Sequence, residues 1–241
     1  MTEELNMYDA ITHTHNKIRN TEYELDMHDL FPSSLEESYM QNIVTDRLIL
    51  RNFAATDAAG LLEYTANPRV NCFMDHQMST LEEAVAEVEK RSKDDSHIAV
   101  CLKDSNEIIG ELFGMTEGHD PDSDSDSDSK SNSDSKSDPD TYSVGWNFNG
   151  RFEGKGYASE SARAFMEYLF MEQGIRRIYA YVEDDNFRSQ KLCEKLGMRR
   201  EGLFLEFISF VKNEDGTPKY ENTYQYAILK KEWLAQQATA K

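Results

Sequence analysis

The residues with the clearest potential for chemistry form a glycine-rich turn at 149–158, which reads Asn-Gly-Arg-Phe-Glu-Gly-Lys-Gly-Tyr-Ala. The turn follows a strand-like segment and leads directly into an amphipathic helical pattern. At such a junction, free backbone N–H groups and the positive end of the helix dipole converge on one point, which favours an anion and most often a phosphate. Gly154 and Gly156 permit a close approach because they lack a Cβ. Arg151 and Lys155 add positive charge.

The turn matches neither of two familiar phosphate-binding patterns. A Walker loop would place Gly-Lys-Ser/Thr after a four-residue gap, and a dinucleotide fingerprint would need a third glycine and a later acidic residue. In most proteins a lone Gly-x-Gly is only a tight turn. By itself, the turn predicts an anion site without identifying the anion.

A second polar motif begins about thirty residues later, at Asn186. Asn186 precedes a helical pattern that carries Leu192 and Leu196 and stops at Gly197, so its side chain is well suited to cap the helix. Ser189 lies one turn along the same helix. A capping asparagine and a surface serine are ordinary helix features. This motif therefore indicates a functional site only in combination with the glycine-rich turn that precedes it.

Apolar periodicity predicts the elements that position these motifs. We expect strands at 46–53, 97–103, 107–115, 141–148, 177–182, 203–211 and 220–229, the last two forming a hairpin through the turn-rich residues 213–218. One helix should follow Thr56 as its N-cap, and another should begin at a capping box, Thr80–Glu83, with Leu81, Ala84, Val85 and Val88 on one face. This order predicts an α/β protein of the α+β type, with a mixed, mostly antiparallel twisted sheet and helices on both faces.

The composition excludes several classes of function. The 241 residues carry a formal charge of −19, which opposes binding to nucleic acid and to anionic membranes. No uncharged apolar run approaches the ~18 residues of a membrane-spanning helix, and the first residues do not resemble a signal peptide. Three cysteines without metal or disulfide spacing favour a reducing, cytoplasmic location. Residues 141–241 contain fourteen acidic and fifteen basic residues, so this part does not repel an anion.

Two segments are predicted to be accessory to one domain at 43–241. Residues 1–42 form an acidic extension with His13 and His15; no further ligand completes a metal site, and a regulatory or dimerising arm is an open alternative. Residues 117–140 contain a Ser/Asp-rich tract, which we interpret as a disordered loop insertion between two strands, because it has too few apolar residues to fold. A phosphorylation or cation-binding tract is the alternative.

In combination, the motifs resemble those of the GNAT acetyltransferase superfamily. Residues 151–158 are similar to its acyl-CoA pyrophosphate loop, and residues 186–198, Asn-Phe-Arg-Ser-Gln-Lys-Leu-Cys-Glu-Lys-Leu-Gly-Met, look like its Asn-x-x-Ser…Glu-Lys-Leu-Gly-Phe segment. Val144-Gly145-Trp146 is similar to the strand before the loop. Residues 45–51 and 226–229 match the branch that includes the ribosomal-protein N-terminal acetyltransferases. The resemblance spans about 43–235 without the Ser/Asp tract.

The resemblance implies a cofactor and the residues that bind it. Acetyl-CoA would act as acetyl donor, with no metal. In the superfamily, the strand before the loop separates from its neighbour and its free backbone groups hold the pantetheine arm. The residues that correspond here are Trp146, Asn147, Phe148, Arg151, Phe152, Glu153, Gly154, Lys155, Gly156, Tyr157, Ala158, Asn186 and Ser189.

The resemblance also implies direct attack of an amine on the thioester, through a tetrahedral intermediate. Ser189 would stabilise or protonate the CoA thiolate, unless it is a plain surface serine. Many relatives have a tyrosine acid where this chain has Cys193, for which buried packing is the expected role. The base would be Glu206 or Glu111, each through a water, with a slight preference for Glu206. Either could equally be a solvated strand carboxylate.

The acceptor follows less directly from the sequence. We expect a primary amine, first of all a protein or peptide N-terminal α-amine. A polyamine or an aminosugar antibiotic is the alternative among enzymes, and a catalytically silent acyl-CoA-binding sensor or scaffold is the alternative outside them. We expect no nucleic-acid or membrane partner and a monomer or homodimer.

Overall fold

The computed structural model describes residues 40–116 and 140–239 of the chain. The expectations for the extension at 1–39 and for the Ser/Asp tract at 117–139 lie outside these residues. So does the possible metal site at His13 and His15. Within the described ranges, no helix combines the length and the apolar character needed to cross a bilayer.

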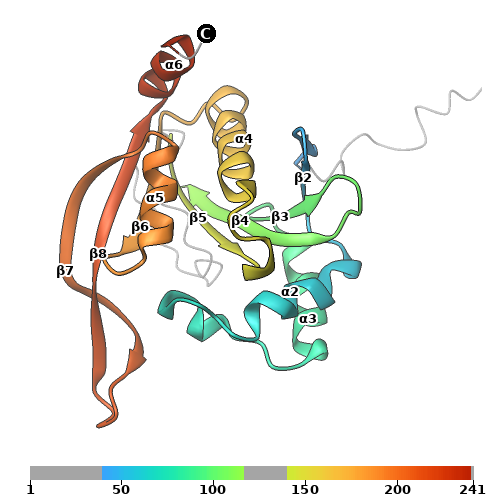
Figure 1. The fold of residues 1–241 in the computed structure, drawn as a ribbon, viewed down its shortest axis with the longest axis vertical. Helices are drawn as coiled ribbons and strands as arrows, with labels where there is room; N and C mark the ends of the chain where they lie inside the picture. Colours follow the sequence, from blue (N-terminus) through green and yellow to red (C-terminus); the bar gives the residue numbers. More distant parts are fainter. Residues whose placement is uncertain (1–39, 117–139, 240–241) are drawn as a thin grey trace, which may run out of the picture. The chain divides into compact units, whose positions relative to one another are not determined.

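An eight-stranded sheet forms the centre of the described chain (Figure 1). Its strands are β1 (Ile43–Val44), β2 (Leu48–Arg51), β3 (His97–Leu102), β4 (Ile108–Thr116), β5 (Thr141–Phe148), β6 (Arg177–Glu183), β7 (Arg199–Lys212) and β8 (Pro218–Leu229). The spatial order is β1-β2-β3-β4-β5-β6-β8-β7. Every neighbouring pair is antiparallel except β5 and β6. The predicted mixed, mostly antiparallel sheet is therefore confirmed.

The parallel pair is short, and this opens the middle of the sheet. β5 and β6 are paired at only three positions, the last of which joins Ser143 to Tyr179. Beyond this point β5 continues along β4 as far as Phe148, while β6 continues along β8. The two strands thus separate towards their C-terminal ends, and no other strand of residues 40–116 and 140–239 pairs with this edge of β5.

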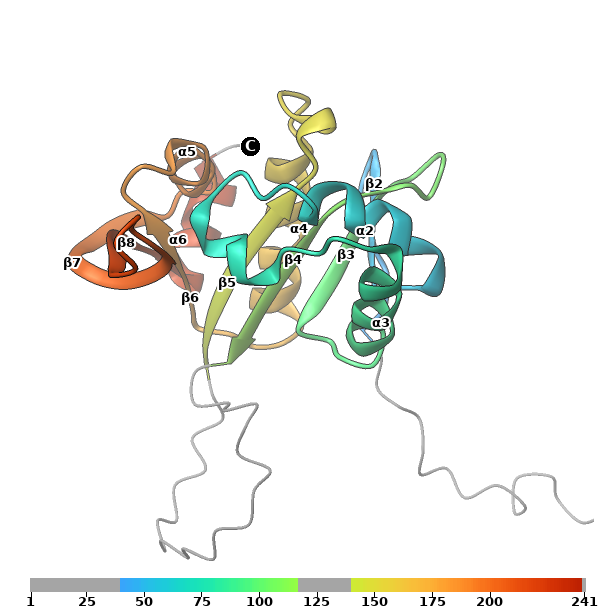
Figure 2. The ribbon, with the colours of Figure 1, turned by 90° about the horizontal axis from the view of Figure 1, so that it is seen from below.

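Helices cover both faces of the sheet and create two cores (Figure 2). On one face lie η1 (Ala55–Asp57), α2 (Ala58–Thr65), η2 (Asn71–His76) and α3 (Leu81–Arg91); on the other lie α4 (Tyr157–Met171) and α5 (Phe187–Lys195). Successive side chains of β3 point to opposite faces of the sheet, so this strand contributes to both cores. Val100 packs in the core on the α4–α5 side, and Cys101 packs in the core on the α2–α3 side. A final helix, α6 (Lys230–Thr239), follows β8 and buries Trp233.

Two details of the predicted helices were wrong. Thr56 lies inside η1, and the helix α2 begins after Asp57, whose buried carboxylate binds the Arg51 guanidinium at 2.7 and 2.8 Å. α3 begins at the predicted Thr80 capping box, but Leu81 and Val85 are about half exposed. Its buried stripe is Ala84, Val88 and Arg91, because the arginine turns inward to a carboxylate on β4.

The last two strands form the predicted hairpin, with β8 between β6 and β7. The hairpin turn closes through a hydrogen bond from Asn213 N to Thr217 O at 2.8 Å. β7 is the edge strand, and its register against β8 shifts between Phe204 and Ile208. The connection η2 packs against β7, so it bridges the open part of the sheet.

Candidate active site

The glycine turn has the backbone geometry that an anion-binding junction needs. After β5, a short helix η3 (Gly150–Phe152) turns the chain, and α4 begins at Tyr157. Gly154 and Gly156 have φ of 80° and 82°, a conformation in which residues with a Cβ are strained. A Cβ added at Gly154 would have no atom within 4 Å, so the space in front of the turn is open.

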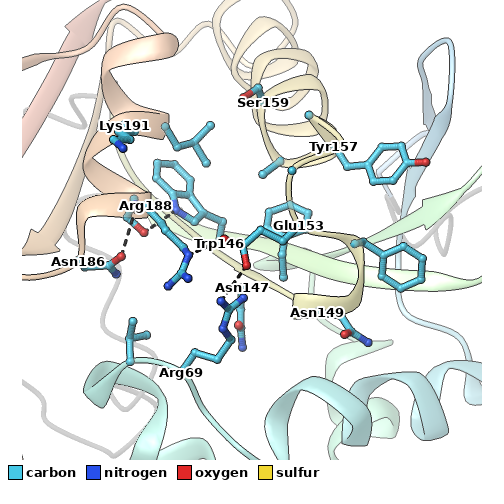
Figure 3. A pocket seen from close by; sticks show the side chains of 18 of the residues that line it. Arg69, Trp146, Asn147, Asn149, Glu153, Tyr157, Ser159, Asn186, Arg188 and Lys191 are labelled. Carbon is cyan, nitrogen blue, oxygen red and sulfur yellow. Dashed lines mark hydrogen bonds and ion pairs between the residues drawn. The ribbon is translucent and has the colours of Figure 1, made fainter.

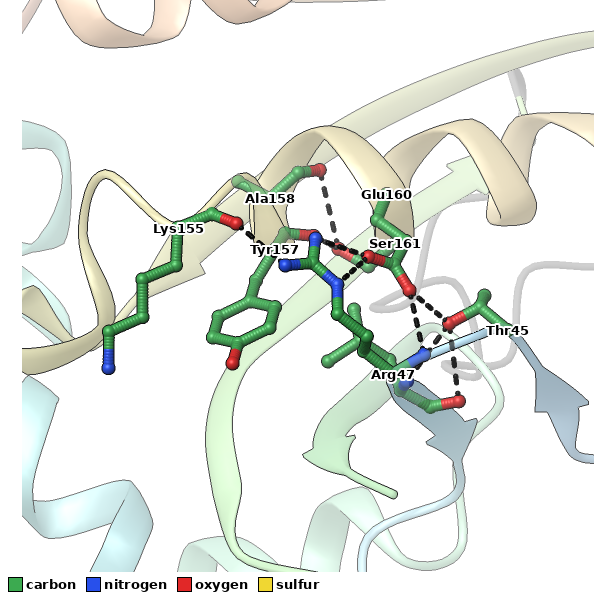
Figure 4. Close-up of polar contacts among 8 residues, drawn as sticks. Thr45, Arg47, Lys155, Tyr157, Ala158, Glu160 and Ser161 are labelled. Atoms are coloured by element: carbon green, nitrogen blue, oxygen red, sulfur yellow. Dashed lines mark hydrogen bonds and ion pairs between the residues drawn. The ribbon is translucent and has the colours of Figure 1, made fainter. Parts of the chain in front are cut away.

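The turn is held in place by residues 45–47, which were singled out in the sequence (Figure 4). Glu160, in the first turn of α4, accepts hydrogen bonds from Thr45 Oγ1 at 2.6 Å and from Arg47 Nε at 2.7 Å. Arg47 Nη1 also donates to the carbonyl of Lys155 at 3.0 Å. The same arginine therefore fixes both the turn and the helix that follows it.

In front of the turn lies a cavity of about 370 Å³, which we call the loop cavity (Figure 3). It is enclosed by the end of β5, the glycine turn, α5 and the chain before η2. Its lining includes most of the predicted cofactor residues, namely Trp146, Asn147, Phe148, Phe152, Glu153, Gly154, Gly156, Tyr157, Ala158, Asn186 and Ser189.

The two predicted cations, Arg151 and Lys155, do not line the loop cavity. The Arg151 guanidinium binds both carboxylate oxygens of Glu63 on α2, at 2.6 and 2.7 Å. The Lys155 ammonium lies 5.4 Å from the centre of the Phe152 ring. Arg151 thus connects the turn to α2. The two cations of the turn therefore do not provide the positive charge that lines the loop cavity.

Four other cations line the loop cavity: Arg69, Arg188, Lys191 and Lys195. Three of them belong to α5 at helical spacing, so their common face could have been found from the sequence. Arg69 lies before η2 and carries no such signal. Arg69 and Arg188 both bind the Glu153 carboxylate, at 2.8 and 2.6 Å (Figure 3), and these hydrogen bonds lower the pKa of Glu153.

Asn186 and Ser189 form a fixed polar pair at the start of α5. Asn186 Oδ1 accepts a hydrogen bond from Ser189 N at 3.2 Å, which confirms its role as N-cap. The Ser189 hydroxyl accepts a hydrogen bond from Trp146 Nε1 at 3.1 Å (Figure 3). An indole N–H can only donate, so the Ser189 proton remains available for another acceptor.

A second cavity, of about 590 Å³, lies on the α2–α3 side, and we call it the sheet cavity. Its walls come from η2, β4, β5 and β6. The two cavities share five lining residues: Phe73, Trp146, Asn147, Asn186 and Ser189. They therefore meet where β5 and β6 separate.

The two predicted bases lie in different surroundings. Glu111 lines the sheet cavity but is buried, ion-paired with Arg91 and 3.3 Å from His97 Nδ1. Glu206 is exposed on β7 with φ of 48°, at the register shift, and lines neither cavity. The structure thus does not bring Glu206 to the other candidate residues.

Sequence reasoning missed Glu183, a third carboxylate at the end of β6. Glu183 is 8% exposed and lines the sheet cavity. Asn186 Nδ2 donates to its Oε2 at 3.5 Å, and the Cys72 thiol lies near enough to interact with the carboxylate. Burial and the neighbouring Glu183 carboxylate raise the pKa of Cys72 far above its usual range, so Cys72 stays a thiol. The sequence signal that could have identified Glu183 was its position between the end of a strand and the cap of a helix.

Cys193, where the superfamily resemblance implied a tyrosine in many relatives, is fully buried in the α4–α5 core. Burial raises the pKa of its thiol to about 12. The expectation that Cys193 packs in the core is therefore confirmed. Among the residues with described positions, no three His, Cys, Asp or Glu side chains are grouped closely enough to hold a metal ion.

Comparisons of sequence and of structure with known proteins both find acetyltransferases. The family model for the acetyltransferase (GNAT) domain matches residues 47–199. The uncharacterized N-acetyltransferase YnaD of Bacillus subtilis is 34% identical over 193 residues, which cover 80% of this chain and 99% of YnaD. A GNAT-family acetyltransferase from Bacillus anthracis matches in structure with a TM-score of 0.63 and 29% identity, over 79% of this chain and 99% of that one. A ribosomal-protein-S5-alanine acetyltransferase from Vibrio fischeri shares the fold, with a TM-score of 0.55 and 17% identity over 80% and 99% of the two chains.

Proposed function

This chain belongs to the GNAT acetyltransferase family, and we propose from this premise that it acetylates the N-terminal α-amine of a peptide or protein. The family domain implies acetyl-CoA as donor and an amine as acceptor. The observation that carries the proposal is the meeting of the two cavities between β5 and β6. Donor and acceptor can thus reach one point from two different cavities.

On the donor side, acetyl-CoA would occupy the loop cavity. The backbone N–H groups of residues 152–157 and the start of α4 suit its pyrophosphate, and the lining cations Arg69, Arg188, Lys191 and Lys195 suit its other phosphate charge. The β5 edge beyond Ser143, which no strand pairs, would hydrogen-bond the pantetheine amides.

The reaction joins the amine nitrogen to the acetyl carbon and breaks the bond from that carbon to sulfur. The nitrogen gives up a proton, and the departing thiolate gains one or is stabilised by a donor. We assign the donor role to Ser189, whose hydroxyl oxygen is already engaged by Trp146. Of the two carboxylates suggested by the sequence, we retain Glu111 for the amine proton, through a water, because it lines the sheet cavity.

On the acceptor side, the sheet cavity is open to solvent. Met115 and Tyr181 on its wall are each 44% exposed, so a chain attached to the amine can leave the cavity while the amine stays inside. This supports a peptide α-amine. A small amine is the second candidate, because a cavity of about 590 Å³ is large enough to enclose one entirely.

Release of the CoA thiol in the presence of candidate acceptors tests the proposal. N-terminal peptides, polyamines and aminosugars are each incubated with the protein and acetyl-CoA, and binding of acetyl-CoA is measured in parallel. We expect one of the peptides to accelerate thiol release above the acceptor-free rate. If acetyl-CoA binds and no amine accelerates the release, the transferase proposal fails and a silent acyl-CoA-binding module remains.

A further inference from the structure

The sheet cavity contains one carboxylate whose charge is not balanced. Glu111 and Glu183 are the acidic residues in its described lining, and Arg91 forms an ion pair with Glu111. No lysine, arginine or histidine at positions 40–116 or 140–239 forms a salt bridge with Glu183, although its side chain is largely buried. A buried anion is costly unless a cation or strong donors compensate it. The amide of Asn186 and the thiol of Cys72 are weak compensation.

Glu183 also lies next to the place where the two cavities meet. Its hydrogen-bond donor Asn186 lines both cavities and caps the helix that carries Ser189. A cation bound to Glu183 would therefore be close to the group that we assign to the CoA sulfur. This is where the nitrogen of an acceptor must arrive.

An aromatic surface extends from Glu183 along β6. Tyr179, Tyr181 and Glu183 alternate on the strand and so share one face, and all three line the sheet cavity. The ring of Tyr181 lies 5.5 Å from that of Tyr179 and 5.4 Å from that of Phe207, measured between centroids.

The outer part of this surface is exposed, since Tyr181, Phe204 and Phe207 have exposed fractions of 44, 39 and 46%. Clustered exposed aromatic rings of this kind are typical of binding surfaces. A buried carboxylate beside this aromatic surface fits a ligand that carries one ammonium group with an apolar substituent next to it.

We propose that Glu183 binds the ammonium group of the acceptor. The aromatic surface formed by Tyr179, Tyr181, Phe204 and Phe207 then selects the side chain next to that ammonium group. The acceptor is then a monoamine, specifically a peptide N-terminus whose first side chain is aromatic or large and aliphatic. This inference rests on the proposed function and defines its substrate class. A polyamine fits the cavity poorly, because its additional ammonium groups find no further unbalanced carboxylate among the described lining residues.

Glu221 provides a matched control for Glu183. Glu221 lies on β8, near enough to contribute to the raised pKa of Cys72, but it is outside the cavity lining. Its carboxylate accepts a hydrogen bond from Asn71 Nδ2 at 2.5 Å, which a glutamine can retain. Glu221→Gln thus removes one negative charge nearby without changing the cavity.

The first experiment compares Glu183→Gln, Glu183→Asp and Glu221→Gln with the wild type. We expect Glu183→Gln to raise KM for the peptide Phe-Ala-Ala-amide at least about tenfold, as for loss of a charged hydrogen bond, and to leave acetyl-CoA affinity unchanged. Glu183→Asp should restore part of the loss, and Glu221→Gln should have no effect. An unchanged KM in a folded Glu183→Gln variant, with folding checked by thermal melting, overturns the role of Glu183.

The second experiment measures selectivity by binding, so it does not depend on turnover. Phe-Ala-Ala-amide, Ser-Ala-Ala-amide and spermidine are titrated calorimetrically into the protein saturated with CoA. We expect the phenylalanine peptide to bind at least about tenfold more tightly than the other two, and Tyr181→Ala to remove this preference. Tighter binding of spermidine or of the serine peptide overturns the inference. In that case thiol release with the serine peptide would leave the proposed function standing, whereas thiol release with spermidine alone would favour the small-amine candidate.

Discussion

The indole of Trp146 orients the Ser189 hydroxyl, and this contact decides what Ser189 can do. The serine oxygen accepts from Trp146 Nε1 at 3.1 Å, so its own proton can be directed to a second acceptor in the shared part of the two cavities. Asn186 fixes the same residue through its backbone N–H. The superfamily resemblance suggested Asn186 and Ser189, but the sequence gave no sign of the contact with Trp146.

Ser189→Ala should lower kcat about tenfold to a hundredfold, as expected for removal of a proton donor, with little change in KM for acetyl-CoA. Trp146→Phe should produce a smaller decrease, because the hydroxyl stays but loses its orientation. Steady-state thiol release measures both. Glu194→Ala, an exposed change on the same helix, is the control, and unchanged turnover in Ser189→Ala would remove Ser189 from this role.

At the scale of elements, the glycine turn is specified by local backbone conformation. Gly154 and Gly174 both have positive φ, of 80° and 71°, and a Cβ at either would meet no atom within 4 Å. An alanine should therefore cost about 1–2 kcal/mol of stability at each position, because its Cβ is strained in the left-handed conformation. Of these two glycines, Gly154 lines the loop cavity and Gly174 does not.

We therefore predict that Gly154→Ala weakens acetyl-CoA binding at least about tenfold, because the new Cβ occupies space that the pyrophosphate would approach, and that Gly174→Ala does not. Calorimetric titration with acetyl-CoA and thermal melting separate the two effects. Equal loss of affinity in both variants would show that backbone strain, and not blocked approach, is responsible.

The first turn of α4 is attached to the start of the sheet through Glu160. Partial burial alone would raise the pKa of Glu160, but hydrogen bonds from Thr45 and Arg47 outweigh it and lower the pKa below the usual 4.5. Because the folded pKa is lowered, this carboxylate stabilises the fold above the unfolded value, and the contribution is lost as pH falls through the folded pKa.

Glu160→Gln should accordingly reduce the free energy of unfolding by about 1 kcal/mol near neutral pH, and the difference from wild type should shrink below about pH 4.5. Urea unfolding at a series of pH values measures this. Glu89→Gln, in the exposed ion pair with Lys93, is the control and should differ little from wild type. A difference that stays constant into strong acid would contradict the assignment.

At the scale of the whole molecule, the Ser/Asp tract is inserted where the fold tolerates additional chain. Its flanking strands β4 and β5 are antiparallel neighbours, and Thr116 is paired with Tyr142. The two ends of the insertion are thus adjacent, so a short hairpin connection can replace it. Asp140, the last residue of the tract, is bound to the fold, because its carbonyl accepts from Arg176 N at 2.7 Å and its carboxylate binds Arg176 Nε at 2.6 Å.

Deletion of residues 119–138 should leave the melting temperature and acetyl-CoA affinity unchanged. Deletion of residues 119–140 should lower the melting temperature, since it also removes the Asp140 contacts. The two deletions are compared by thermal melting and by calorimetry with acetyl-CoA. If the shorter deletion already abolishes binding, the tract contributes to function and the interpretation as an inert insertion is wrong.

Most of the fold could be read from local signals. The Thr80 capping box, the Asn186 cap, the hairpin turn at 213–217 and strand β5 all depend on residues close together in the chain, and the structure has them as expected. The inward turn of Arg91 was not readable, because its partner Glu111 lies twenty residues away on another element. The exposed positions of Leu81 and Val85 follow from the same long-range pair.

The sequence by itself determined the glycine turn, the helix caps and the superfamily resemblance, because glycine conformation and capping act within a few residues. Only the tertiary structure decided which charges face the cavities. Arg151 binds Glu63 and Arg69 binds Glu153 across 88 and 84 residues of chain, so the expected cation is engaged and an unexpected one lines the site. The surroundings of Glu183 were decided in the same way, since its burial beside the aromatic rings of β6 and β7 depends on the order of β6, β8 and β7 in the sheet.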